Sequence, residues 1–255
     1  MIDNQQLTTF VLMLARVSAF IAFFPLFAQR QLPRLIKTGL ALSLTLFWFG
    51  TLPQEQFVDV QMNLVNSVLY LGKEIGIGFL LAQLLGFMFV PAKVAGAYIG
   101  QEMGLSLASV TSPGSLDSST LVTTLLEIFS IMLFFGLNMH HFMVAFIHHS
   151  LIHIGAQVSL TDLPTELLVQ TTGSLTEQGN LIVGPAGICL FILTIGLALL
   201  NKAAPTLNLF SVGMSLRSGI GIFCLVVFFP VIIKSMTMYL ELHQRQLEDL
   251  SLIHI

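Results

Sequence analysis

Six apolar segments, most of them long enough for a membrane-spanning helix, are separated by less apolar connections along the 255-residue chain. They cover roughly Leu7–Phe27, Leu35–Leu52, Leu64–Val90, Leu121–Ser150, Leu181–Leu200 and Gly219–Leu240. A helix needs about 20 residues to cross the hydrocarbon core of a bilayer. The pattern therefore predicts an all-α membrane protein with about six long helices in hairpins. The second is short for a straight span, and the third and fourth are long enough to tilt or project.

Composition supports a membrane environment. Apolar residues make up 55% of the chain, charged residues only 9%, and the mean hydropathy is +0.88. A soluble domain carries about 25% charged residues, so this chain has too few to cover a water-exposed surface. No stretch is polar enough to form a soluble domain, so we predict one membrane domain over residues 1–255. The net charge of -3 and the absence of a basic run leave nothing to hold nucleic acid.

The charges in the connections predict an orientation. Lys and Arg residues follow the first, third and fifth apolar segments: Arg30, Arg34, Lys37, Lys93, Lys202 and Arg217. The other two connections contain neither residue type. Because positively charged short loops stay cytoplasmic, both termini are expected in the periplasm. This requires Ala92–Ser119 to return on the side it entered, or to lie across an assembly without spanning.

Small residues recur at every fourth position between the third and fourth apolar segments. Residues spaced by four share one helix face, where missing side chains let another backbone approach closely. Ordinary packing within the chain and contact with another subunit both remain open. The predicted ladder consists of Ala92, Gly96, Gly100, Gly104 and Ala108.

The ladder runs into an irregular segment, LSLASVTSPGSLDSS at Leu105–Ser119. Pro113-Gly114 is a turn signal, and the Ser and Thr residues discourage regular helix. Irregular backbone beside spanning helices cannot face lipid, so it must be buried in protein or line a water-filled cavity. A plug or re-entrant segment fits this, and a plain cytoplasmic loop is the alternative. The predicted plug residues are Leu105, Ser106, Leu107, Ala108, Ser109, Val110, Thr111, Ser112, Pro113, Gly114, Ser115 and Leu116.

Five ionisable residues stand in apolar surroundings: Arg16, Lys73, Glu74, Glu102 and Glu127. Such residues are costly in a bilayer and usually pair or face a cavity. Lys73 and Glu74 point about 100° apart on a helix, so we do not expect them to pair with each other. Interhelical or intersubunit pairing is expected rather than a proton relay, and the sequence does not identify the partner of Arg16.

No catalytic, metal or cofactor site is predicted. The chain lacks Walker A, GxSxG, HExxH and Cys-rich metal motifs, and Cys189 and Cys224 are expected to be buried, inert thiols. Histidines crowd the end of the fourth apolar segment, without the carboxylate that supports most metal sites. We expect them to be solvated at a membrane interface: His140, His141, His148, His149 and His153.

The connection Asn201–Ser218, NKAAPTLNLFSVGMSLRS, is too apolar for free exposure. Its flanking Lys and Arg place it on the cytoplasmic side. Exposed apolar patches usually meet a partner, although a re-entrant turn packed on its own chain is the alternative. The candidate partner contacts are Lys202, Pro205, Asn208, Phe210, Gly213 and Arg217.

Four segments resemble the FliR-type family of export-gate proteins. They are LARVSAFIAFFPLF at Leu14–Phe27, KEIGIGF at Lys73–Phe79, AGAYIGQEMGLSLASVTSP at Ala95–Pro113 and NKAAPTLNLFSVGMSLRSGIG at Asn201–Gly221. They occur in the family's order and at its spacing. The resemblance implies a subunit of the flagellar type III protein export gate. Its location would be the bacterial inner membrane, at the flagellar basal body.

The resemblance further implies a FliP-like part over residues 1–162 and a FliQ-like hairpin part over residues 163–255. The implied partners are FliP-like and FliQ-like subunits, in a 5:4:1 ratio with this chain, together with FlhB, FlhA and unfolded flagellar export substrates. A pore plug would match Leu105–Ser119, and a hairpin tip that meets FlhB would match Lys202–Arg217. The alternatives are a self-contained small-solute transporter, against which stands the lack of inverted repeats, and a purely structural assembly scaffold.

Overall fold

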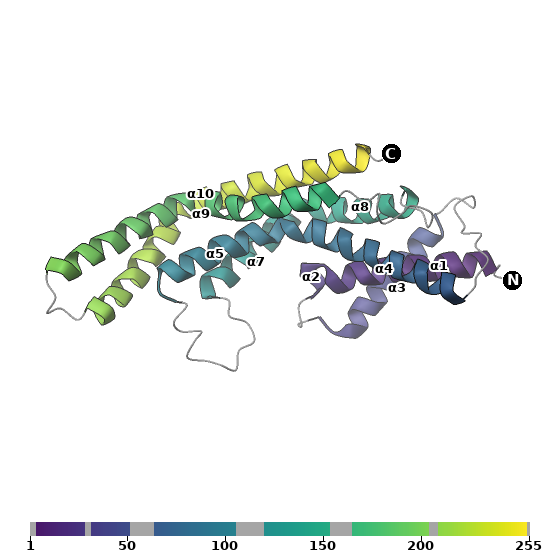
Figure 1. Ribbon diagram of the computed structural model, residues 1–255, viewed down its shortest axis with the longest axis horizontal. Coiled ribbons are helices and arrows are strands. Elements are labelled where there is room, and N and C mark those ends of the chain that lie inside the picture. The colour runs from purple at the N-terminus through teal and green to yellow at the C-terminus, as the bar shows by residue number, and fades with distance from the viewer. Residues whose placement is uncertain are drawn as a thin grey trace. The chain divides into compact units, whose positions relative to one another are not determined.

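The computed structural model describes residues 4–28, 32–51, 64–105, 120–153, 165–203 and 209–253, and within these ranges all regular structure is helical (Figure 1). The all-α prediction is therefore confirmed for the described residues. In chain order the helices are α1 (Asn4–Phe23), α2 (Pro25–Ala28), α3 (Arg34–Phe49), α4 (Leu64–Gly86), the 3-10 turn η2 (Phe87–Phe89), α5 (Val90–Glu102), α7 (Leu121–Gly136), α8 (Met139–His153), α9 (Thr165–Ala203) and α10 (Leu209–Ile253).

The described helices provide four candidate membrane spans, or five if the bent pair α7 and α8 counts as one. The four are Gln5–Phe23, Val65–Glu102, Thr172–Leu200 and Gly213–Glu248. The sequence predicts about six. The second predicted segment forms α3, whose 16 residues reach only about 24 Å. The third predicted segment forms α4, and the same candidate span continues through η2 and α5 to Glu102. The ladder residues in α5 therefore extend this span.

The fourth predicted helix is broken where a left-handed residue interrupts it. Asn138 has a φ of 58°, between the end of α7 and the start of α8. Asparagine tolerates this conformation better than most residues, because its short polar side chain can bond locally. Hydrophobicity alone does not report such a break, since both halves are apolar.

The chain forms two compact units. Unit 1 comprises Met1–Phe87, Asn138–Val169 and Gln244–Ile255, and its core is built on α1. Helix α1 packs against α3 and closely against α4. The close approach to α4 occurs at Gly78, where an added Cβ would overlap the carbonyl of Arg16 and lie 3.0 Å from Ala19 Cβ.

Unit 2 comprises Met88–Leu137 and Gln170–His243. Its apolar core takes residues from four helices and from Met103, directly after α5; α9 supplies four of these residues and α5 three. Two glycines of α9 bring this helix close to α5: a Cβ at Gly179 would lie 2.7 Å from Val94 Cβ, and one at Gly187 2.9 Å from Tyr98. The core residues are Ala92, Ala95, Ile99, Met103, Val122, Leu126, Ile182, Val183, Ala186, Leu190, Ile232 and Met236.

Helices α9 and α10 are longer than a bilayer is thick. Their 39 and 45 residues reach about 58 and 68 Å, against a hydrocarbon core of about 30 Å. They pair within unit 2, where the sulfur atoms of Cys189 and Cys224 lie 3.1 Å apart. The charged stretch Glu241–Asp249 is part of α10.

Candidate functional site

Helix α5 ends in a Schellman turn that requires a glycine. The Gly104 N–H donates to the Gln101 carbonyl at 3.0 Å, and the Leu105 N–H donates to the Gly100 carbonyl at 2.9 Å. This pattern places Gly104 in the left-handed region, with a φ of 75°, where glycine lacks the steric penalty of a Cβ. The turn therefore satisfies the last carbonyls of α5 and fixes the chain at Leu105.

Helix α7 begins with a side-chain cap from Thr120. The Thr123 N–H donates to Thr120 Oγ1 at 3.3 Å, which pairs one of the N–H groups that a helix start leaves open. The Thr120 side chain also packs on α5, because a Cβ at Gly100 would overlap it. Leu105 and Thr120, the residues that flank positions 106–119, are therefore both anchored at Gly100.

The ladder residues form a close seam between α5 and α7. A Cβ at Gly96 would lie 2.5 Å from the Cα and 3.0 Å from the N of Thr123, and Ala92 is buried in the core of unit 2. Of the two uses that the sequence leaves open, the structure shows packing within the chain. Contact between the ladder and another subunit stays a prediction.

The ladder is shorter than the sequence predicts. Because α5 ends at Glu102, Gly104 lies in the terminal turn and not on the packing face, and an added Cβ there would meet nothing within 4 Å. Position 104 needs glycine because the turn places its backbone in the left-handed region. Gly104 falls on the four-residue spacing of the ladder but does not contribute to the packing face. Ala108, the last predicted ladder residue, lies outside the described residues.

The predicted plug begins at the end of α5. Of its twelve residues only Leu105 is described, and it packs against the core of unit 2. The residues from Ser106 to Leu116 lie outside the described part of the chain. The structure thus defines where the segment leaves α5 and where it enters α7, and its place in a pore stays a prediction.

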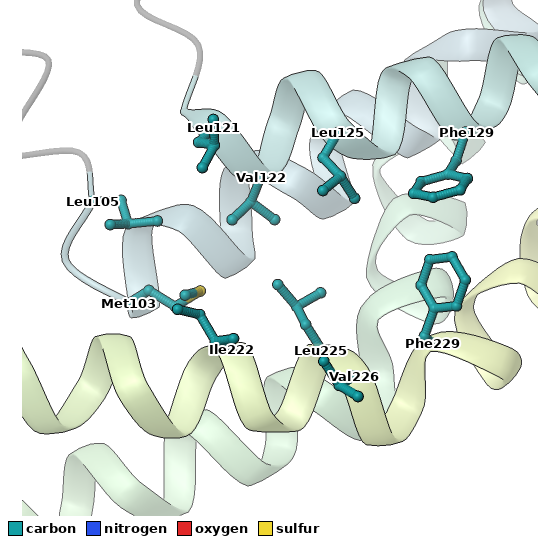
Figure 2. Close-up of a pocket in the computed structure, with 10 residues that line it drawn as sticks. All are labelled: Met103, Leu105, Leu121, Val122, Leu125, Phe129, Ile222, Leu225, Val226 and Phe229. Atoms are coloured by element: carbon teal, nitrogen blue, oxygen red, sulfur yellow. The ribbon is translucent and has the colours of Figure 1, made fainter.

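We call Met103–Leu105, where the predicted plug leaves α5, the plug root. An apolar cavity of about 410 Å³ lies beside it (Figure 2). The end of α5, the first turns of α7 and the middle of α10 line it. The rings of Phe129 and Phe229 face each other edge to face, with centroids 4.8 Å apart. All its lining residues are apolar: Met103, Leu105, Leu121, Val122, Leu125, Phe129, Ile222, Leu225, Val226 and Phe229.

Arg16 and Glu74 form a buried, bidentate ion pair within unit 1. Arg16 Nε donates to Glu74 Oε2 at 2.6 Å and Nη2 to Oε1 at 3.0 Å, with the side chains only 3% and 4% exposed. Arg16 Nη1 also donates to the carbonyl of Ser150 on α8. The partner that the sequence cannot name is thus on α4, and the pair joins three helices.

The other ionisable residues are less deeply placed. Glu127 accepts from Lys93 at 2.9 Å, and these side chains are 20% and 44% exposed. Glu102 accepts a hydrogen bond from Thr194 Oγ1 of α9 at 3.2 Å. Lys73 is half-buried on α4, one residue before the buried Glu74. Arg16, Glu74, Glu102 and Glu127 thus each contact a residue of another helix in this chain, and a role in contacts between subunits stays a prediction.

The predicted partner contacts surround the α9–α10 connection. Lys202 is exposed in the last turn of α9, Phe210 lies in the first turn of α10, and Pro205 and Asn208 lie outside the described residues. Gly213 is buried, with Leu197 of α9 3.9 Å from the position of an added Cβ, and Arg217 is half-buried. The exposed Lys202 and the buried Gly213 therefore do not share one exposed face.

Sequence reasoning misses the contacts that α10 makes with the end of α5. Ser218 Oγ donates to the Met103 carbonyl at 3.1 Å, and a Cβ at Gly221 would overlap the Met103 side chain. The available signal is the run of small residues in RSGIGIF at Arg217–Phe223, which is typical of close helix packing. Among the described residues, no group of three or more His, Cys, Asp or Glu is placed to hold a metal ion.

The sequence from residue 7 to residue 242 matches the model of a protein family described as bacterial export proteins, family 1. The chain belongs to this family. The match covers nearly the whole chain, both units included, so the resemblance carried by the four quoted segments is confirmed.

The similar proteins include relatives named for flagellar biosynthesis and a relative named for the translocation of Yop proteins. "Flagellar biosynthetic protein FliR" of Bacillus subtilis (strain 168) is 24% identical, over 88% of this chain and 86% of its own length. The protein of the same name from Escherichia coli (strain K12) is 29% identical, over 86% and 83%. "Yop proteins translocation protein T" of Yersinia pestis is 25% identical, over 88% and 87%. Identity alone does not separate the flagellar relatives from the Yop relative.

Proposed function

We propose that this chain is a subunit of the flagellar type III protein export gate, through which unfolded flagellar subunits cross the inner membrane. The observation that carries the proposal is the family match over residues 7–242, with relatives named for flagellar biosynthesis and protein translocation. The four or five apolar candidate spans support an inner-membrane location. The orientation with both termini in the periplasm follows from the Lys and Arg distribution.

In the closed gate, the segment from Leu105 to Leu116 occupies the channel as a plug. The support is the anchoring at Gly100 of Leu105 and Thr120, which flank positions 106–119, beside the buried seam between α5 and α7. A segment that is fixed at both ends to a packed core resists displacement, so it can keep a channel blocked. An apolar constriction supplied by neighbouring subunits would exclude ions by dewetting.

The gate is an assembly of this chain with FliP-like and FliQ-like subunits in the 5:4:1 ratio of the family. Residues 1–162 take the place of a FliP-like subunit and residues 163–255 that of a FliQ-like hairpin. Exposed apolar side chains on both long helices support the need for partners, among them Ile188, Ile192, Phe223 and Val226. FlhB meets the exposed end of the hairpin near Lys202, and FlhA is a further partner.

Two measurements test the proposal. The tagged chain, co-expressed with FliP-like and FliQ-like partners, should purify with them, and the mass of the intact complex should match the assembly. Deleting residues 107–117 keeps the Schellman turn and the Thr120 cap, so the variant should still assemble. Its ion leak across the inner membrane should rise above that of the full chain.

A matched control replaces residues 107–117 by an equal length of glycine and serine, which restores the loop length without the native side chains. An assembled deletion variant with unchanged leak would overturn the plug. Purification of the chain alone, without partners, would instead favour the small-solute transporter. Assembly without any leak in either variant would favour the scaffold.

A further inference from the structure

The structure brings the two cysteines of the chain together, although they are 35 residues apart in the sequence. The thiol of Cys224 on α10 donates to the sulfur of Cys189 on α9, with the two sulfur atoms 3.1 Å apart. A disulfide bond is about 2.05 Å long, so the sulfur atoms need to approach by only about 1 Å. Rotation of the side chains about their Cα–Cβ bonds supplies a movement of this size. The sequence predicts two inert thiols, and the structure shows a pair one small step from a bond.

The two thiols differ in exposure, and the difference gives them separate roles. Cys224 is only 3% exposed, whereas Cys189 is half-buried. An oxidation-sensitive pair needs one thiol that the oxidant reaches and a second thiol beside it that resolves the oxidised sulfur. Cys189 fits the first role by its exposure, and Cys224 fits the second by its distance from Cys189.

The surroundings of the pair restrict the kind of oxidant. Both cysteines lie in candidate membrane spans, and their neighbours Ile188 and Phe223 are exposed apolar side chains. Bringing an ion into such surroundings is costly, whereas a small uncharged molecule enters at little cost. A hydroperoxide, of which hydrogen peroxide is the simplest, meets this condition. A large anionic oxidant such as glutathione disulfide does not.

We propose that Cys189 and Cys224 form an oxidation site, at which a small uncharged hydroperoxide converts the two thiols into a disulfide that joins α9 to α10. With hydrogen peroxide, the Cys189 sulfur attacks one oxygen, the O–O bond breaks, and one water leaves a sulfenic acid on Cys189. The Cys224 sulfur then attacks the Cys189 sulfur, the S–O bond breaks, and the second water leaves. The two thiols lose two electrons and two protons in total, which reduce the peroxide to two water molecules.

The disulfide acts as a cross-link within unit 2, to which both cysteines belong. It closes a loop between positions 35 residues apart, and a cross-link of this kind stabilises a fold mainly by restricting the unfolded chain. The thermal unfolding midpoint of the oxidised complex should therefore rise by about 5–10 °C, and a reducing agent should reverse the rise. The inference goes beyond the proposed function and does not depend on it, because the contact that carries it lies within this chain.

The first test counts thiols in the assembled complex in membranes. After treatment with hydrogen peroxide, the complex is denatured in N-ethylmaleimide, and the mass of the intact chain gives the number of adducts. The untreated chain should carry two adducts. The oxidised chain should carry none, at a mass lower by two hydrogen atoms, and dithiothreitol should restore both. Because the chain contains only two cysteines, a disulfide within it can join only these two positions.

A matched control moves one thiol by a single position. The double variant Cys224→Ser and Phe223→Cys keeps two cysteines, but the new thiol lies about 100° around α10 from the old one, at a position that is exposed in the chain. It should form no disulfide within the chain under the same treatment. Glutathione disulfide in place of the peroxide should leave both thiols of the unmodified chain free to react with the maleimide.

Each measurement has an outcome that overturns the oxidation site. It is overturned if the unmodified chain still takes up two maleimide groups after peroxide treatment. It is also overturned if the control variant forms a disulfide within the chain as fast as the unmodified chain does. Equal unfolding midpoints for the oxidised and reduced complexes would overturn the cross-link between α9 and α10. Failure of the proposed function would show separately, as a 107–117 deletion variant that assembles and does not leak.

Discussion

The buried pair of Arg16 and Glu74 gives a sharp prediction for stability. Replacing Glu74→Gln preserves the shape of the side chain and removes its charge, leaving the guanidinium of Arg16 in a site where the two side chains are only 3% and 4% exposed. Breaking a buried pair in this way costs about 3–5 kcal/mol, because the remaining charge is neither hydrated nor neutralised. The carbonyl of Ser150 remains as a partner for Arg16, but it carries no full charge.

The structure supplies a matched control and a rescue. Glu127→Gln removes the same charge from the pair with Lys93, whose side chains are 20% and 44% exposed, so it should cost less than about 1 kcal/mol. The double variant Arg16→Met and Glu74→Leu removes both charges and keeps apolar volume. It should recover most of the stability lost in Glu74→Gln.

The assay is the unfolding transition of the detergent-purified complex in denaturant, together with the amount of chain that accumulates in membranes. Glu74→Gln should lower both, and Glu127→Gln should lower neither appreciably. The reasoning would be refuted if Glu74→Gln were as stable as Glu127→Gln. It would also fail if the double variant were less stable than Glu74→Gln, since an uncompensated charge would then not be the cause.

Three further substitutions test the region around the plug root. Gly100→Ala should weaken the α5–α7 seam, because the new Cβ overlaps Thr120. The control Gly72→Ala should not destabilise the chain, because an added Cβ there meets nothing within 4 Å. Thermal unfolding of the complex compares the two variants. Gly104→Ala should cost about 1–2 kcal/mol through its φ of 75°, and Gly104→Asn less, by the same assay. Thr120→Val removes the α7 cap and should cost about 1 kcal/mol, seen as faster hydrogen exchange in the first turn of α7.

Local periodicity in the sequence predicts much of the fold. A four-residue spacing identifies the face of Gly96 and Gly100, since close packing on a helix needs small residues in register. The same spacing includes Gly104, where the glycine is needed for a left-handed turn. Spacing does not distinguish these two uses, because both are satisfied by the absence of a Cβ, so the predicted ladder is too long.

Contacts between distant segments are beyond this kind of reasoning. The sequence shows that Arg16 needs a partner, because an unpaired cation in apolar surroundings is costly. It does not show that the partner is Glu74, 58 residues away, since pairing depends on how α1 packs on α4. The contact between Ser218 and Met103, 115 residues apart, cannot be predicted from the sequence for the same reason.

Hydropathy finds apolar helices but not their ends. Helix α9 begins at Thr165, well before the apolar run at Leu181, because polar residues such as Glu177 and Gln178 are good helix formers. Conversely, α7 and α8 read as one apolar segment, and the left-handed Asn138 divides them. Helix length follows from backbone hydrogen bonding and packing, which hydropathy does not measure.

The most direct test of the account asks whether the exported chain passes the predicted plug. Thr111→Cys, in a chain with Cys189→Ala and Cys224→Ala, would carry a short thiol-reactive crosslinker in the assembled complex, with a flagellar export substrate stalled in transit. The control is Phe191→Cys on α9, which is exposed in the chain and expected to face lipid or a neighbouring subunit. The account predicts crosslinking to the substrate from position 111 and none from position 191. A stalled substrate that crosslinks from position 191 and never from position 111 would contradict it.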